Sequence, residues 1–409
     1  MTREIQDRPP LRCMFVITSM PVGGAETLLV NLVRRLDRDR IEPMICCLKE
    51  PGELGERIKH DVPLFSHMIS HRYDVHVIRR LQRLFKDHRI DCVITVGAGD
   101  KMFWGRLAAK YAKVPVILSA LHSTGWPDGV GRLNRCLTSI TDGFIAVADD
   151  HQRFLIDHER FPSDKVFLIP NGIDNDVFMF NTTARQEWRT RLGIDSADPV
   201  VGIVAALRPE KNHELFMRLA ASTSAHFPQA HFLIIGDGPR RADLQHLASA
   251  TNCANNIHFL GSCSDIPGIL SALDLFALTS HNEASPVSIL EAMSCARPVV
   301  APNVGSIRQA VLHEKTGYLY DPRDENAALQ GWLTCLANQG LREQLGAAGR
   351  EHVSAYGSLH SMTEGYMRLI ERLHSKKTER KSNQRYQANS GATFAKHAMN
   401  SAENLNDYR

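Results

Sequence analysis

Residues 275–298, LFALTSHNEASPVSILEAMSCARP, contain an apolar run, a polar loop and a helix-like segment in that order. The run 275–278 has the length and composition of a strand buried inside a parallel sheet. Ser285 is a residue type that commonly caps a helix, and Pro286 suits the first helical position. A strand followed by a loop and a helix is the repeating unit of an α/β sheet, and we expect the fold to be built from such units.

Two glutamates lie within this unit. Glu283 is on the loop just outside the carboxyl end of the strand, and Glu291 is inside the helix. Ligands of open α/β sheets bind beyond the carboxyl ends of the strands, and a helix N-terminus there attracts anions. A carboxylate beside an anion site is better suited to accept hydrogen bonds from sugar hydroxyls than to bind phosphate. The spacing therefore indicates a nucleotide sugar, with a solvated glutamate on a helix face as the simpler alternative.

The bulk properties of the chain restrict the class of protein. A chain of 409 residues exceeds what one hydrophobic core usually supports, so we expect two domains. The net charge of +3 is too small to indicate nucleic acid as a partner. The nine cysteines are scattered without a C-x-x-C motif, and we interpret them as reduced residues of a cytosolic protein. We expect no signal peptide and no membrane span.

Strand-like runs alternate with helical stretches in two series, which predicts two Rossmann-like units. The first series comprises residues 12–18, 42–48, 92–96, 116–120, 143–148 and 166–169. The second comprises residues 200–205, 231–235, 257–260, 273–278 and 298–301. We therefore expect a disordered leader at 1–10, domains at 11–178 and 179–351, a long helix at 352–373 and a disordered polar tail at 376–409.

Loops at the predicted strand ends carry residues suited to ligand binding. Gly23 and Gly24 follow the first strand and allow the backbone to approach a ligand with its amides exposed. Arg208 and Lys211 follow a strand of the second series, and this pair of cations suits a diphosphate. His122 directly follows another strand of the first series. A tight turn, solvated charge and a structural histidine remain the respective alternatives.

The segment 72–113 is basic and rich in aromatic residues. Ten Arg or Lys residues stand against four acids, and five residues are Phe, Tyr or Trp. Such a surface could lie against an anionic membrane, and a solvated helix surface is the alternative.

Several motifs, taken together, resemble the family 4 retaining glycosyltransferases of the GT-B type. In chain order they are PVGGAE at 21–26, IPNGID at 169–174, LRPEKN at 207–212, IGDGP at 235–239 and the segment 280–291. The resemblance covers about residues 11–373. It implies two Rossmann-like domains that face a central cleft, with a C-terminal helix that crosses back onto the first domain.

The resemblance also implies roles for individual residues. Arg208 and Lys211 would hold the donor diphosphate, and Glu283 would contact the donor sugar. Glu291 would contact the ribose, and His122 would lie near the transferred sugar. The remaining expected donor contacts are Gly23, Gly24, Gly236, Gly261, Ile266, Ser285, Pro286 and Val287.

The activity implied is transfer of a sugar from a nucleotide-diphosphate sugar, with UDP the commonest carrier in this family. The expected acceptor is a glycan or lipid-linked glycan of surface polysaccharide synthesis at the cytosolic membrane face. Neither a metal nor another cofactor is expected. The sequence departs from the family pattern at residues 284–286, where Ala-Ser-Pro replaces Gly-aromatic-Gly, and at Gln309, where an acid is common. A nucleotide-sugar epimerase and a non-catalytic nucleotide-sugar-binding protein are the alternative functions.

Overall fold

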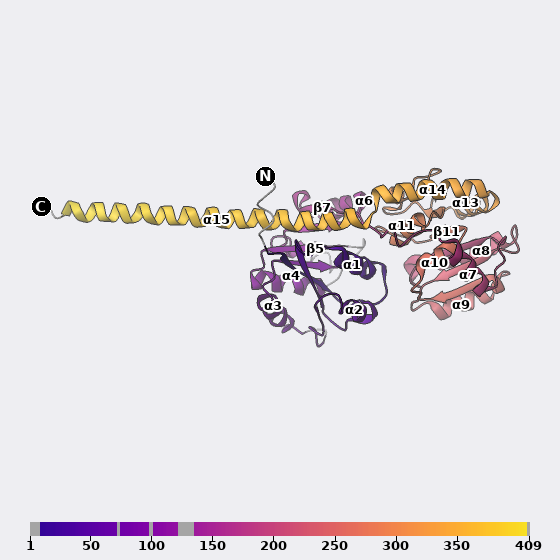
Figure 1. The fold of residues 1–409 in the computed structure, drawn as a ribbon, viewed down its shortest axis with the longest axis horizontal. Helices are drawn as coiled ribbons and strands as arrows, with labels where there is room; N and C mark the ends of the chain where they lie inside the picture. The colour runs from indigo at the N-terminus through magenta and orange to yellow at the C-terminus, as the bar shows by residue number, and fades with distance from the viewer. Residues whose placement is uncertain (1–8, 72–73, 98–100, 122–134, 407–409) are drawn as a thin grey trace.

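The computed structural model describes residues 9–71, 74–97, 101–121 and 135–406. Within these residues the chain forms two parallel sheets, each in its own α/β unit, and the two units lie side by side (Figure 1). The strands of the first sheet lie in the order β3-β2-β1-β4-β5-β6-β7, and those of the second in the order β10-β9-β8-β11-β12-β13. The expected pair of Rossmann-like units is thus present.

The strands agree with the sequence-based expectations to within a few residues, and β3 and β13 were not expected. The first sheet contains β1 (Leu11–Ile17), β2 (Ile41–Cys47), β3 (Leu64–Phe65), β4 (Cys92–Val96), β5 (Val116–Ala120), β6 (Gly143–Ala146) and β7 (Val166–Leu168). The second contains β8 (Val200–Val204), β9 (His231–Ile235), β10 (Ile257–Gly261), β11 (Leu275–Ala277), β12 (Val299–Pro302) and β13 (Gly317–Tyr320).

The helices connect and cover these strands. Those of the first unit are α1 (Gly24–Arg35), α2 (Gly52–Ile58), α3 (Val77–Asp87), α4 (Lys101–Ala112) and α6 (Asp149–Arg153). Those that follow are α7 (Thr182–Leu192), α8 (His213–Ser224), α9 (Arg241–Ser249), α10 (Ile266–Ala272), α11 (Val287–Ser294), α12 (Ile307–Ala310), α13 (Glu325–Ala337), α14 (Gln339–Tyr356) and α15 (Leu359–Asn406).

Strand β1 explains why the first sheet is covered on both faces. Alternate side chains of a strand point to opposite faces. Phe15 belongs to a core formed with α1 and the first turns of α15, whereas Met14 belongs to a second core formed with α3 and α4. A strand buried on both faces has a continuous apolar sequence, which is why residues 11–17 were recognisable from the sequence.

The sheet order also determines where a ligand can bind. In the first sheet the chain moves outward from β1 to β2 and β3, and then returns to β4 on the other side of β1. The second sheet repeats this reversal between β8 and β11. Ligands of open α/β sheets bind beyond the carboxyl ends of the strands at such a reversal. The loops after β1, β8 and β11 therefore lie at the favoured positions.

The two segments that connect the units lie against each other. Ile173 and Ser358 form a parallel β-bridge, and the amide of Ile173 donates to the carbonyl of Gly357 over 2.9 Å. Gly172 lies so close that an added Cβ would be 2.2 Å from the carbonyl oxygen of Ser358. The helix expected over 352–373 is therefore interrupted: α14 ends at Tyr356 and α15 begins at Leu359, because residues 357–358 are taken up by this pairing.

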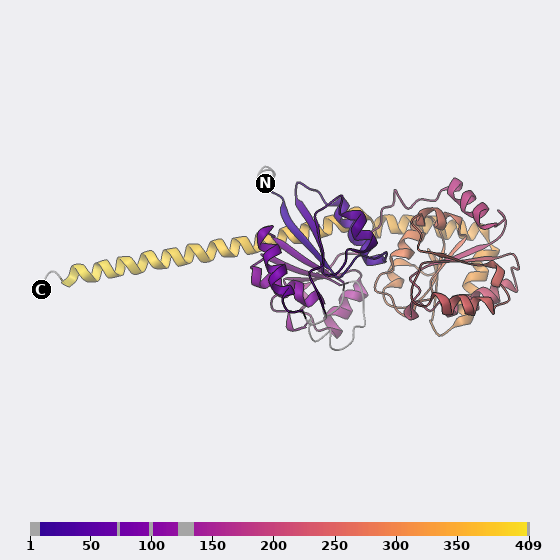
Figure 2. The same cartoon turned by 90° about the horizontal axis from the view of Figure 1, so that it is seen from below.

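Helix α15 then packs across the first unit, as the crossover helix was expected to do (Figures 1 and 2). Its later part runs beyond both units as a single helix to Asn406. This differs from the disordered tail expected from residue 376. The segment 376–406 contains no proline and one glycine, and its many Lys, Glu, Gln and Ala residues favour helix formation.

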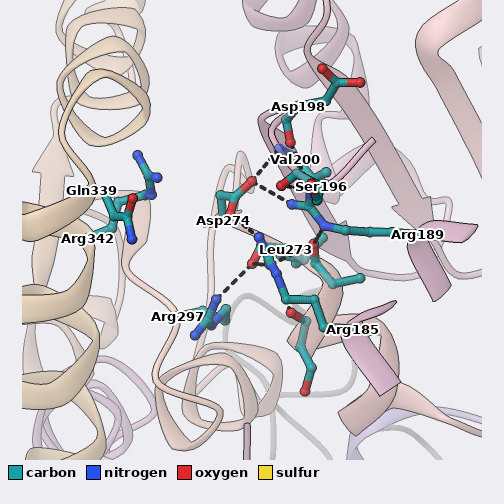
Figure 3. Close-up of polar contacts among 12 residues, drawn as sticks. Arg185, Arg189, Ser196, Asp198, Val200, Leu273, Asp274, Arg297, Gln339 and Arg342 are labelled. Atoms are coloured by element: carbon teal, nitrogen blue, oxygen red, sulfur yellow. Dashed lines mark hydrogen bonds and ion pairs between the residues drawn. The ribbon is translucent and has the colours of Figure 1, made fainter. Parts of the chain in front are cut away.

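A network of hydrogen bonds and ion pairs lies at the amino ends of β8 and β11 in the second sheet (Figure 3). The carboxylate of Asp274 accepts hydrogen bonds from Arg185 over 2.6 Å, from Arg189 over 2.7 Å and from the amide of Val200 over 2.9 Å. Burial alone would raise the pKa of Asp274, but the two guanidinium groups outweigh burial and lower it. The network joins α7 to the segments that precede β8 and β11, on the side of the sheet away from the candidate site.

Candidate active site

The loops that follow β8 and β11 bring two of the predicted residues into direct contact. Lys211 Nζ lies 2.6 Å from Glu283 Oε1. The side chain of Glu283 is 9% exposed and that of Lys211 is 23% exposed, so the pair is largely shielded from water while the lysine can still reach a ligand. A cation suited to phosphate and a carboxylate suited to hydroxyls therefore lie side by side.

The β8 and β11 loops are held together by further hydrogen bonds. Thr279 Oγ1 donates to the carbonyl of Lys211 over 3.0 Å, and the amide of His281 donates to the carbonyl of Glu210 over 2.9 Å. Within the β11 loop, Ser280 Oγ donates to Glu283 Oε1 over 2.7 Å. These bonds hold the two loops together and orient the side chain of Glu283.

Glu283 is also held through its backbone. Its carbonyl accepts the amide of Ser306 over 3.1 Å. An added Cβ on Gly305 would lie 1.8 Å from the same carbonyl oxygen, and Gly305 has a positive φ of 51°. Only glycine fits this approach, so the loop before α12 supports the loop that carries Glu283.

Helix α11 begins one residue later than predicted. Pro286 is in the N-cap position with ψ of 111°, and Val287 is the first helical residue. Ser285 therefore does not cap the helix. Its carbonyl instead accepts a hydrogen bond from Asn171 Nδ2 over 3.3 Å, which ties the start of α11 to the segment joining the two units. Apolar spacing alone cannot reveal such a contact, since Asn171 is 114 residues away.

Glu291 lies inside α11 and is buried. Its exposed fraction is 9%, and no hydrogen bond to its carboxylate is found among the residues that the structure describes. Burial raises the pKa of Glu291 to about 7. A buried carboxyl without a protein partner is available to ligand hydroxyls, which is compatible with the ribose contact implied by the resemblance.

The glycine pair of the first unit lies at the start of α1. Gly23 occupies the N-cap position and Gly24 the first helical position, so both glycines expected in a loop belong to the start of the helix. A Cβ on Gly24 would lie 3.9 Å from Val287, which places the start of α1 close to the start of α11 across the two units. Two helix N-termini thus meet at this point, and both favour an anion there.

Glu26 lies near Arg208 of the second unit and was not among the predicted site residues. It lies in the first turn of α1, and an added Cβ on Gly23 would be 2.4 Å from its carboxylate. Burial raises its pKa, which outweighs a hydrogen bond to its own backbone amide and the opposing charge of Arg208. The positive charge of Arg208, in the second unit, thus favours the ionised form of Glu26 in the first unit. The segment PVGGAE contained Glu26, but the sequence alone did not show that it faces a cation from the other unit.

The remaining predicted donor contacts lie after β9, at the end of β10 and at the start of α10. The amide of Gly236, after β9, donates to the carbonyl of Gly261 at the end of β10 over 2.9 Å. Gly236 and Gly261 have positive φ values of 137° and 70°. Ile266 is the first residue of α10, which Asp265 caps by accepting the amide of Gly268 over 3.0 Å.

Two predictions concern the position of His122 and the question of a metal site. His122 lies outside the described residues, so its position stays a prediction. Among the described residues, no group of three or more His, Cys, Asp or Glu side chains is arranged to hold a metal ion.

Comparisons with known families agree with this architecture. Residues 22–177 match the model described as Glycosyltransferase Family 4, and residues 184–352 match the model described as Glycosyl transferases group 1. The first match lies in the first unit and the second match lies in the second unit.

Individual relatives cover most of the chain. It is 26% identical over 322 residues to the Escherichia coli UDP-Gal:alpha-D-GlcNAc-diphosphoundecaprenol alpha-1,3-galactosyltransferase, covering 75% of this chain and 83% of that protein. It is 27% identical over 287 residues to the GDP-mannose-dependent alpha-(1-6)-phosphatidylinositol monomannoside mannosyltransferase of Mycolicibacterium smegmatis, covering 67% and 74%.

Solved structures show the same fold. The Anabaena HepE crystal structure in complex with UDP-glucose has a TM-score of 0.78 at 21% identity, covering 90% of this chain and all of that chain. A Rickettsia africae glycosyltransferase has a TM-score of 0.77 at 19% identity, covering 89% and 98%. Together with the matching motifs and the two parallel-sheet units, these findings show that the chain belongs to the family 4 glycosyltransferases, which have the GT-B fold.

Proposed function

We propose that this glycosyltransferase moves a sugar from UDP to a glycan or lipid-linked glycan, with retention of configuration, during surface polysaccharide synthesis. The observation that carries the proposal is the contact between Lys211 and Glu283 at the carboxyl ends of β8 and β11. It combines a group for phosphate and a group for sugar hydroxyls at the place where this fold binds ligands.

In the proposed reaction, Lys211 and Arg208 bind the diphosphate of the donor and stabilise the negative charge that grows on it as the glycosidic bond breaks. Glu283 accepts hydrogen bonds from hydroxyls of the donor sugar. The acceptor hydroxyl attacks the same face of the sugar from which the diphosphate departs. The departing phosphate oxygen takes the acceptor proton, so the configuration is retained without a covalent enzyme intermediate.

We further propose that the reaction needs no metal ion. Lys211, Arg208 and the start of α11 would supply the positive potential that a divalent cation supplies elsewhere. His122 would lie near the transferred sugar, as the resemblance implies.

UDP is proposed as the carrier, and a lipid-linked glycan as the acceptor. The Escherichia coli relative is named for a UDP-galactose donor and a diphosphoundecaprenol-linked acceptor, whereas the mycobacterial relative is named for GDP-mannose. HepE is described in complexes with UDP, with UDP and glucose, and with UDP-glucose. These names support a UDP-sugar and leave GDP-mannose as the alternative to be tested.

A peripheral membrane contact through residues 72–113 would bring the site to such an acceptor. Among the side chains of this segment that the structure describes, the exposed cations are Arg79, Arg83, Lys86, Arg89, Lys110 and Lys113. Tyr111 beside them is 57% exposed. Not every cation contributes, since Arg106 is buried and Arg80 pairs with Asp74. Within the described residues, no helix has both the length and the apolar character needed to cross a bilayer.

A thermal-shift titration with UDP, GDP, ADP and CMP, with and without EDTA, tests the donor assignment. A ligand that binds only the folded state raises the melting temperature by mass action. We expect UDP to give the largest shift and EDTA to leave it unchanged. A larger shift with GDP would change the carrier, a shift lost in EDTA would overturn metal independence, and no shift with any nucleotide would contradict the proposed donor site.

Turnover separates transfer from the two alternatives. Release of UDP coupled to extension of a lipid-linked glycan is expected. An epimerised sugar formed without acceptor would favour a nucleotide-sugar epimerase, and binding without turnover would favour a nucleotide-sugar-binding protein.

Sedimentation with vesicles tests the membrane contact. We expect the protein to bind vesicles that contain phosphatidylglycerol and not vesicles of phosphatidylcholine alone. Arg79→Glu with Arg83→Glu should release it, whereas Arg323→Glu in the second unit should not, because Arg323 is exposed outside the basic segment. Equal binding by both variants would contradict a contact through α3.

A further inference from the structure

Two hydroxyl groups directly after β11 each contact one member of the Lys211–Glu283 pair. Thr279 is 2% exposed and Ser280 is 1% exposed. Thr279 Oγ1 donates to the backbone carbonyl of Lys211 over 3.0 Å, and Ser280 Oγ donates to Glu283 Oε1 over 2.7 Å. Buried hydroxyls need hydrogen-bond partners, and here both partners belong to the candidate site.

We propose that Thr279 and Ser280 are positioning residues. Thr279 fixes the backbone of Lys211 so that its side chain reaches the donor diphosphate, and Ser280 determines which oxygen of Glu283 faces the donor sugar. This inference rests on the proposed function, since it assigns the two groups to different parts of a nucleotide sugar.

The argument for Ser280 starts from the carboxylate that it contacts. The last torsion of a glutamate side chain is soft and nearly two-fold, so a lysine alone does not determine which of the two oxygens it binds. Ser280 and Lys211 both donate to Oε1, from opposite loops. Two donors on one oxygen fix that torsion. Among the described residues both of these bonds end on Oε1, and Oε2 is the oxygen that we assign to a sugar hydroxyl.

The argument for Thr279 concerns the backbone. Lys211 is the last residue of the short helix η3 (Pro209–Lys211), and Asn212 follows with a positive φ of 50°. The helix η3 is too short to fix its own end by repeated internal hydrogen bonds. The hydroxyl of Thr279 holds the carbonyl of Lys211 directly, and so determines how far the lysine side chain extends beyond the sheet.

The two roles predict different kinetic defects. Ser280→Ala should lower kcat by about 10- to 100-fold, because a hydrogen bond to a charged group is lost where the sugar reacts. Its affinity for UDP should change by less than about 2-fold, since UDP lacks the donor sugar that Glu283 would contact, and Thr279 still holds the backbone of Lys211. Thr279→Val keeps the shape of the side chain and removes the hydroxyl. It should weaken UDP binding by about 10-fold, and Thr279→Ser should restore the binding.

Ser271→Ala is the matched control. Ser271 is a fully buried serine of the same unit, and its hydroxyl donates to the carbonyl of Pro267 over 2.9 Å and accepts the amide of Asn181 over 3.1 Å, so it contacts neither Lys211 nor Glu283. This variant shows what the loss of a buried serine hydroxyl does to stability alone. It should lower the melting temperature, and any changes in kcat and UDP affinity should be parallel to each other.

The experiment measures UDP affinity by calorimetry, and kcat by UDP release from UDP-glucose, UDP-galactose and UDP-N-acetylglucosamine, for the full-length wild type and the four variants. The opposite patterns of Ser280→Ala and Thr279→Val are the expected result. Wild-type kcat in Ser280→Ala, or parallel losses of kcat and affinity that follow the melting temperature as in Ser271→Ala, would overturn the inference alone. A wild-type protein that neither binds UDP nor releases it from any donor would instead overturn the proposed function, and the inference with it.

Discussion

Lys211 and Glu283 are 72 residues apart in the chain, yet Nζ and Oε1 lie 2.6 Å from each other. They meet because β11 pairs directly with β8, so that the loops at the carboxyl ends of these two strands are neighbours. The pairing of these two strands therefore brings the two charges together. The sequence around either residue alone does not reveal the contact.

The first prediction concerns Glu283. Glu283→Gln keeps the size of the side chain and removes its charge, so the bond from Ser280 can persist while the ion pair with Lys211 is lost. We expect kcat to fall by about 100-fold or more, by analogy with the loss of one electrostatic contact to a transition state. The free energy of unfolding should fall by only about 1–2 kcal/mol, because Lys211 can still reach water. Steady-state kinetics and urea unfolding measure the two effects, and unchanged turnover would remove Glu283 from the active site.

The second prediction concerns the two cations. Arg208→Ala and Lys211→Ala should each weaken UDP binding by about 10- to 100-fold, since a charge-assisted hydrogen bond to a phosphate oxygen is lost in each. Uridine, which lacks the diphosphate, should bind both variants and the wild type equally weakly. Calorimetric titration of UDP and uridine makes the comparison. Arg323→Ala, an exposed arginine that pairs only with Asp321 among the described residues, serves as the control. If UDP affinity is unaffected in both variants, the phosphate site lies elsewhere.

The third prediction follows from the buried carboxyl of Glu291. Its pKa is about 7 in the folded protein, against an ordinary value of 4.5. Because the pKa is raised on folding, the folded state favours the protonated acid. The contribution of this group to stability is therefore highest below pH 4.5 and is lost as the pH rises from about 4.5 to 7. The loss could reach about 3 kcal/mol above pH 7.

Glu291→Gln should remove this dependence. We expect the variant to match the wild type at pH 4.5 and to be more stable than it at pH 8, as measured by urea unfolding at both pH values. Other titrating groups affect both proteins equally, so the difference between the two proteins isolates Glu291. Wild-type stability above that of the variant at pH 8 would show that the buried carboxylate has a partner that stabilises its charge.

The sequence predicted the two parallel-sheet units because strands buried on both faces are apolar throughout, as Phe15 and Met14 illustrate by packing into different cores. It also located Lys211 and Glu283, since both follow apolar strand-like runs. It could not predict their contact, which depends on the pairing of β11 with β8.

The contacts between the units were also beyond the reach of sequence patterns. Asn171 was part of a recognised motif, but its bond to Ser285 depends on how the two units are placed. The same placement interrupts the terminal helix at Gly357, which the continuous helical pattern of residues 352–373 did not reveal.

The last prediction tests the paired connections between the units. Gly172→Ala should lower the free energy of unfolding by about 1–3 kcal/mol, because the new Cβ would meet the backbone of Ser358, which cannot move without breaking the bridge between Ile173 and Ser358. Gly340→Ala is the control: its Cβ would have only an ordinary contact, 3.6 Å from Asn338, in the first turn of α14. That variant should be neutral or slightly more stable, since alanine favours the helix over glycine. Thermal unfolding of both variants decides the matter. Equal melting temperatures for Gly172→Ala and the wild type would mean that the two connections separate readily, and that their pairing does not hold the units together.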